Sequence, residues 1–129
     1  MTRTVDEKSP VRVLIVDDEV SYAAALSKRL TVRGMETTKV NSGRRALQIL
    51  REMDFDVVLL DLKMEDVDGL ETLKVIKIMA PNLQVIILTG HGGEAEASLC
   101  LQLGAFDYLV KPCELEAVLK SIARAVEGD

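Results

Sequence analysis

The chain has 129 residues, of which 48% are hydrophobic and 29% charged, and its formal net charge is −5. This length corresponds to about one domain, and the composition argues against a disordered chain. The acidic balance offers no basic surface for nucleic acid, and the apolar runs are far shorter than the roughly 20 residues of a membrane helix. With no signal peptide in view, we expect a cytoplasmic protein with a flexible tail over residues 1–9 and a single domain over residues 10–128.

In chain order, five candidate strand runs, four of them apolar, alternate with five segments whose apolar residues recur at helical spacing. The runs, expected to be strands, cover residues 11–16, 35–40, 56–60, 83–88 and 106–110. The expected helices cover residues 19–33, 43–53, 69–80, 94–103 and 115–126. The alternation predicts an α/β fold with helices on both faces of one parallel sheet. For a single domain of five strands we expect the doubly wound, flavodoxin-like (βα)5 arrangement with strand order 2-1-3-4-5.

Four of the expected strands end in residues that can do chemistry. Asp17 and Asp18 follow the first strand, and Asp61, Thr89 and Lys111 follow or end the third, fourth and fifth. Parallel strands share their carboxyl ends, so all of these residues should emerge at one edge of the sheet. That edge is where open α/β sheets bind ligands.

Three carboxylates crowded at such an edge repel one another unless a cation compensates them. Hard oxygen ligands, without histidine or thiolate, select Mg²⁺ or Mn²⁺ over zinc or copper. Lys111 adds a mobile positive charge and Thr89 a hydroxyl donor. Acid, metal, lysine and hydroxyl together provide the positioning and charge neutralisation that phosphoryl transfer requires.

Five motifs in order strengthen this interpretation: Ile-Val-Asp-Asp-Glu at 15–19, Leu-Leu-Asp-Leu-Lys-Met at 59–64, Asp-Gly-Leu-Glu at 68–71, Leu-Thr-Gly at 88–90 and Tyr-Leu-Val-Lys-Pro at 108–112. Over about residues 11–126 the chain resembles the receiver domain of two-component response regulators. The loop after residue 61 and the Gly-Ala-Phe-Asp-Tyr stretch at 104–108 look most like receivers of the nitrogen-regulation type.

The resemblance implies a phospho-acceptor signalling domain, not a conventional enzyme, which promotes its own phosphorylation and dephosphorylation. Asp61 would be the nucleophile that takes a phosphoryl group from the phosphohistidine of a sensor histidine kinase or phosphotransfer protein. Asp18 and Asp61 would bind Mg²⁺ through their side chains, Lys63 through its backbone carbonyl, and Asp17 mostly through water.

The resemblance also assigns roles to the last two strand ends. Lys111 would pair with the phosphate and Thr89 would bond to it after activation, while Tyr108 would change rotamer with Thr89. The peptide bond between Lys111 and Pro112 is expected to be cis.

One departure from the family lies in the acceptor loop, where Glu65 replaces the common proline. It changes no expected ligand, although the rate of phosphate loss can differ. Lys63 and His91 hold positions that influence attacking water in this family, so we expect them to tune the phosphate lifetime. His91 has the plainer alternative of lining its loop, and Tyr108 that of an ordinary buried tyrosine.

Other classes of function stay open at this point. A Mg²⁺-dependent phosphatase usually has a second aspartate two residues after the nucleophile, where this chain has Lys63. A flavin-phosphate binder would need a loop rich in Ser, Thr and Gly after the first strand, whereas residues 17–19 are all acidic. In the plainest interpretation, the strand-end acids are helix caps and turn residues.

The route of the signal out of the domain is inferred from the family, which uses the surface of the fourth helix, fifth strand and fifth helix. Whether that surface pairs with a second copy or with another protein stays open. No output domain follows the last expected helix, so the chain is either a stand-alone regulator or a segment of a longer one.

Overall fold

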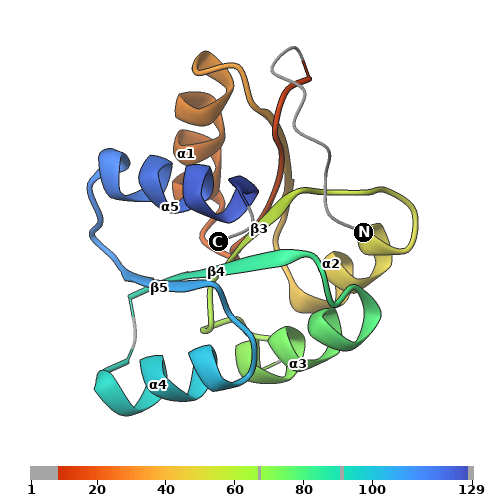
Figure 1. Cartoon of the computed structure of the whole chain (residues 1–129), viewed down its shortest axis with the longest axis vertical. Coiled ribbons are helices and arrows are strands. Elements are labelled where there is room, and N and C mark those ends of the chain that lie inside the picture. The colour runs from red at the N-terminus through yellow and green to blue at the C-terminus, as the bar shows by residue number, and fades with distance from the viewer. Residues whose placement is uncertain (1–8, 67, 91, 128–129) are drawn as a thin grey trace.

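The computed structural model describes residues 9–66, 68–90 and 92–127, in which strands and helices alternate (Figure 1). The strands are β1 (Arg12–Val16), β2 (Glu36–Val40), β3 (Val57–Leu60), β4 (Gln84–Thr89) and β5 (Asp107–Val110). The helices are α1 (Val20–Val32), α2 (Gly43–Leu50), α3 (Gly69–Met79), α4 (Glu94–Gln102) and α5 (Leu115–Glu127). The expected tail over residues 1–9 lies, except for Ser9, outside the described residues.

The five strands form one sheet in the order β2-β1-β3-β4-β5, and every neighbouring pair is parallel. The predicted fold class and strand order are therefore confirmed. Helices α1 and α5 cover one face of the sheet, and α2, α3 and α4 cover the other (Figure 1). Among the described residues, no helix combines the length and apolarity that crossing a bilayer requires.

The continuous apolar character of the central strands follows from burial on both faces. Successive side chains of a strand alternate between faces, so β1 sends Leu14 and Val16 into one core cluster and Val13 and Ile15 into the other. All four residues of β3 are buried in the same alternating way. Complete burial of each such side chain contributes about 1.5–3 kcal/mol to folding, which makes the sheet a rigid platform for its edge.

Local signals set the helix ends largely as expected. Ser42 caps α2 by accepting a hydrogen bond from the Arg45 amide, and Asp68 caps α3 by accepting one from the Leu70 amide. Gly34, just past α1, has a φ of +88°, the left-handed conformation in which glycine ends a helix without strain. Helical spacing is a less reliable guide to burial, because Ile78 is an apolar residue of α3 and is nevertheless 81% exposed.

Candidate functional site

The register of the sheet brings the strand ends together. Val16 pairs with Leu60, so Asp17 and Asp61, one residue further along, lie side by side at the carboxyl edge. The Asp61 amide donates to the Val16 carbonyl at 3.0 Å, which keeps Asp17 and Asp61 in this register. On the other side of β3, the amide of Lys111 donates to the carbonyl of Thr89 at 2.8 Å. The structure thus gathers four of the residues expected at the site.

Asp61 lies at the centre of this group with a carboxylate that is only 5% exposed. The hydroxyl of Thr89 donates to its Oδ1 at 2.7 Å, and the backbone amide of Lys63 donates to the same atom at 3.1 Å. The ammonium of Lys111 lies 3.2 Å from its Oδ2. Each oxygen of the Asp61 carboxylate therefore has at least one donor, and both face the edge of the sheet.

Lys111 is the cation of the site, and it contacts three carboxylates at once. Its Nζ lies 2.7 Å from Asp17, 3.0 Å from Glu19 and 3.2 Å from Asp61. Its side chain is 10% exposed. Burial disfavours the charged form of Lys111, but the hydrogen bonds to Asp17 and Glu19 outweigh burial and raise its pKa above 10.5. The ammonium therefore stays charged at neutral pH.

Asp17 is affected mainly by its burial, which raises its pKa above 3.8 although Lys111 and the amide of Glu19 favour the charged form. The negative charge of Asp61 raises the pKa of Asp17 further, as a smaller effect than burial. Three carboxylates face one ammonium here, so the cluster has an excess of negative charge. A further cation would relieve this excess. One oxygen each of Asp17, Glu19 and Asp61 lie within 4.8 Å of one another, a donor set that suits a hard divalent ion.

This cluster differs in one member from the expected ligand set. Asp18 is half-buried and is not part of the cluster in the described residues, whereas its neighbour Glu19 is. Sequence reasoning left Glu19 out of the site, although it is the third acid of the run at 17–19. Its position before α1 turns its side chain back toward Lys111, a detail of helix entry that spacing alone does not show.

The loop after Asp61 is held by two contacts that were not expected. Gly69 packs so closely on this loop that a Cβ atom there would collide with the backbone of Leu62. Asp66 accepts hydrogen bonds from the amides of Gly43 at 3.2 Å and Arg44 at 3.1 Å, at the start of α2. Leu62 and Asp66 of this loop are thus in contact with the starts of α3 and α2.

The remaining expected site residues are placed less tightly. The side chain of Lys63 is exposed, and only its backbone amide is seen to touch Asp61. Tyr108 is half-buried, and its hydroxyl lies against Gly92 in the loop between β4 and α4. His91 lies outside the described residues. The expected cis peptide between Lys111 and Pro112 is confirmed.

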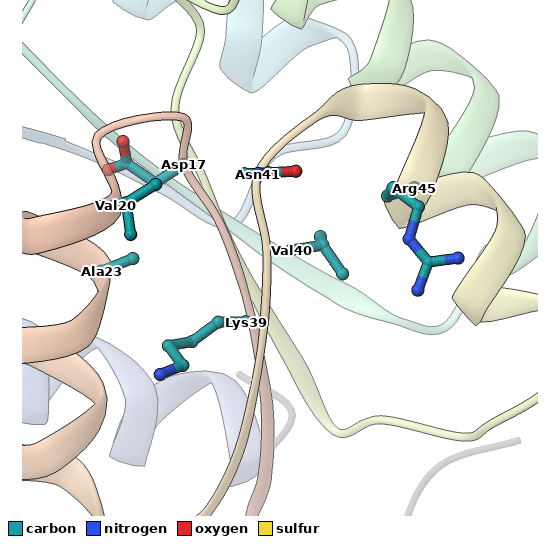
Figure 2. Close-up of a pocket in the computed structure, with 7 residues that line it drawn as sticks. All are labelled: Asp17, Val20, Ala23, Lys39, Val40, Asn41 and Arg45. Carbon is teal, nitrogen blue, oxygen red and sulfur yellow. The ribbon is translucent and has the colours of Figure 1, made fainter.

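A pocket of about 230 Å³ lies next to the carboxylates (Figure 2). It is lined by Asp17, Val20, Ala23, Lys39, Val40, Asn41 and Arg45. In Figure 2 the cationic ends of Lys39 and Arg45 lie on opposite sides of Val40 and do not converge. Arg45 also donates to the side chain of Gln48 at 2.9 Å. The pocket shares only Asp17 with the cluster around Lys111.

Comparison with known proteins agrees with this geometry. A family model described as the response regulator receiver domain matches residues 13–123. The transcriptional regulatory protein ZraR of Escherichia coli (strain K12) is 37% identical over 116 residues, which make up 90% of this chain and 26% of ZraR. The regulatory protein AtoC of the same strain is 36% identical over 116 residues, 90% of this chain and 25% of AtoC. The chain thus spans about a quarter of the length of these relatives.

Solved structures give the same result. A CheY-like receiver domain protein from Methanospirillum hungatei JF-1 has a TM-score of 0.89 and 26% identity, covering 93% of this chain and 96% of that one. The beryllofluoride-activated NtrC4 receiver domain dimer has a TM-score of 0.86 and 37% identity, covering 91% and 97%.

The site and the fold define a phospho-acceptor of the two-component type. The chain belongs to the response regulator receiver domain family, and its relatives are regulators of the nitrogen-regulation type. The resemblance drawn from the five sequence motifs is therefore confirmed. The family function, acceptance of a phosphoryl group in signal transduction, is that of a signalling domain and not of a conventional enzyme.

Proposed function

We propose that Asp61 is the phospho-acceptor of this receiver domain and that the donor is the phosphohistidine of a sensor histidine kinase or a phosphotransfer protein. A carboxylate oxygen of Asp61 attacks phosphorus, and the P–N bond of the phosphohistidine breaks. The imidazole nitrogen leaves with the electron pair of that bond and takes up a proton. The product is an acyl phosphate on Asp61.

One observation carries this proposal: three donors already surround a buried carboxylate at the ligand-binding edge of the sheet. The hydroxyl of Thr89, the amide of Lys63 and the ammonium of Lys111 all contact Asp61 within 3.2 Å. Donors fixed in advance around a reacting group stabilise developing charge without having to reorganise. The same donors are placed to bond phosphoryl oxygens once Asp61 is modified.

The donor set also fits Mg²⁺, with Mn²⁺ as an alternative, because it consists of hard oxygen atoms. The proposed ligands are Asp17, Asp18, Asp61 and the backbone carbonyl of Lys63, and Glu19 joins them because it lies in the cluster. When bound, the ion supplies the positive charge that the three clustered carboxylates lack. Comparing Asp18→Asn with Glu19→Gln in a Mg²⁺ titration separates the two neighbours.

Loss of the phosphate by the domain's own activity is part of the proposal. Lys63 has an exposed side chain on the loop directly after Asp61, where an ammonium can screen the acyl phosphate from water. We expect Lys63 and His91 to tune this lifetime. An unchanged rate of phosphate loss in Lys63→Ala and His91→Ala would contradict that expectation.

The output surface is proposed to consist of α4, β5 and α5. Leu99, Leu101 and Val110 are exposed apolar side chains on α4 and β5. Tyr108 is the proposed switch, because it joins β5 to the loop that follows Thr89 through its contact with Gly92. The related NtrC4 receiver domain is a dimer, so a second copy of this chain is the proposed occupant. A cytoplasmic location belongs to the same proposal.

The experiment is incubation of the purified protein with acetyl phosphate and MgCl₂, followed by intact mass measurement. We expect one phosphate per chain, released by hydroxylamine as an acyl phosphate would be. Asp61→Asn should abolish it, while Asp54→Asn, an exposed aspartate before β3, should not. If Asp61→Asn still takes up phosphate, the proposal is wrong. Size-exclusion chromatography of the phosphorylated protein tests the dimer.

A further inference from the structure

The ammonium of Lys111 has a fourth neighbour besides the three carboxylates. The ring of Tyr22, on the first turns of α1, lies with its centroid 4.1 Å from the Nζ of Lys111. A cation at this distance from an aromatic face is attracted by the electrons of the ring. The contact joins residues 22 and 111, which come from different elements at the edge of the sheet.

The ring is held by packing, whereas the ammonium of Lys111 is held by the three carboxylates that it contacts. Tyr22 is half-buried and packs against the core cluster between the sheet and helices α1 and α5. Lys111 has a long flexible stem and a compact charge that can point in many directions. A fixed ring face beside a mobile ammonium restricts where that ammonium can lie.

This restriction matters because the carboxylates compete for Lys111. The ammonium lies closer to Asp17, at 2.7 Å, and to Glu19, at 3.0 Å, than to Asp61, at 3.2 Å. Glu19 is 63% exposed and can follow the ammonium out toward water. Without a wall on the side of α1, the lysine would spend less time within reach of Asp61.

We infer that Tyr22 is a positioning residue whose ring face keeps the ammonium of Lys111 beside Asp61. The inference rests on the proposed acceptor role of Asp61 and adds to it a residue outside the five motifs. The group that matters is the ring and not the hydroxyl, so phenylalanine should replace tyrosine without loss, whereas an aliphatic side chain should not.

The test compares Tyr22→Phe, Tyr22→Leu and Tyr22→Met with the wild type in the rate of phosphorylation by acetyl phosphate at saturating MgCl₂. We expect Tyr22→Phe to keep the wild-type rate and Tyr22→Leu to lose about fivefold, as a contact of this class would give. Tyr22→Met places a flexible side chain in a similar volume. It replaces Tyr22→Leu in the comparison if the leucine variant does not fold. It should be slowed as well.

A spectroscopic measurement separates positioning from mere packing. The ε-methylene protons of Lys111 should show an upfield ring-current shift in the NMR spectrum of the wild type and Tyr22→Phe, and lose it in the leucine and methionine variants. The inference is overturned if the leucine or methionine variant is phosphorylated at the wild-type rate. It is also overturned if Tyr22→Phe is slow, or if the wild type lacks the ring-current shift. If the wild type takes up no phosphate, the proposed function is wrong. If the wild type and Tyr22→Leu are phosphorylated at the same rate, only the inference about Tyr22 is wrong.

Discussion

Replacing Lys111 by methionine tests whether this lysine is the counter-ion of the site. Methionine has a comparable length but no charge, so the carboxylates of Asp17 and Asp61, 4% and 5% exposed, would face each other uncompensated. Removing one partner of a buried ion pair costs about 3–5 kcal/mol. The ion pair with Glu19 adds little to this cost, because the Glu19 side chain is 63% exposed. Since water reaches the edge of the sheet, we expect the lower end, about 3 kcal/mol.

The assay is urea unfolding in metal-free buffer at neutral pH. With a typical urea dependence of about 1–3 kcal/mol/M for small proteins, a loss of about 3 kcal/mol should lower the midpoint of the Lys111→Met variant by about 1–3 M. The matched control is Lys120→Met, an exposed lysine on α5, which should unfold like the wild type. Equal midpoints for Lys111→Met and the wild type would refute the role of Lys111 as counter-ion.

Magnesium and pH extend this prediction. A ligand present at a hundred times its dissociation constant adds about 2.7 kcal/mol to the free energy of unfolding. MgCl₂ should therefore restore much of the stability that Lys111→Met loses, and it should stabilise this variant more than the wild type. The folded-state pKa of Lys111 lies above 10.5. Its contribution is therefore complete below about pH 10.5 and is lost as the pH rises through the folded-state pKa. The difference between the two proteins should persist through neutral pH and narrow only in strong base.

Three further changes probe the same edge. Thr89→Val removes the donor 2.7 Å from the buried Asp61 carboxylate and should lower the free energy of unfolding in urea by about 1–2 kcal/mol. Gly69→Ala forces a Cβ into the backbone of the acceptor loop and should cost about 1–3 kcal/mol and slow phosphorylation. Gly90→Ala, with open space around its Cβ, is the control. Asp17→Asn removes a carboxylate whose raised pKa makes folding less favourable as pH rises above 3.8. In metal-free buffer at neutral pH it should unfold at higher urea than the wild type and gain less from MgCl₂.

Each of these three has an outcome that counts against it. For the threonine, the control is Thr72→Val, which removes a buried hydroxyl that donates to the carbonyl of Asp68 and not to Asp61. An equal loss of stability in both variants would remove any special role of Thr89. For the glycine, equal stability of Gly69→Ala and Gly90→Ala would show that the acceptor loop can move aside for the added Cβ atom. For Asp17→Asn, a midpoint below that of the wild type would mean that the ion pair with Lys111 outweighs burial.

The sequence predicted the fold and most of the site because both follow from patterns along the chain. Continuous apolar strands report burial on both faces, and the polar residues that follow Val16 and Leu60 must then meet at one edge. The positions of Asp17, Asp61, Thr89 and Lys111 needed no more than the strand order.

What the sequence did not show depends on how side chains turn after the backbone is placed. Glu19 reaches Lys111 because the chain bends into α1, and Tyr22 faces the same ammonium from the helix. Neither follows from spacing, since an acid and a tyrosine at the start of a helix usually face water. The exposure of Ile78 has a similar cause, because helical periodicity gives a face but not the width of the face that a neighbour covers.

Asp66 gives the acceptor loop a mechanical connection to a distant part of the chain. Its two carboxylate oxygens hold the first amides of α2, more than twenty residues earlier, through bonds of 3.2 and 3.1 Å. Such bonds are worth about 1 kcal/mol each, so they open often but hold most of the time. While they hold, a movement of the loop next to Asp61 is coupled to the start of α2, the helix that follows β2 in the chain.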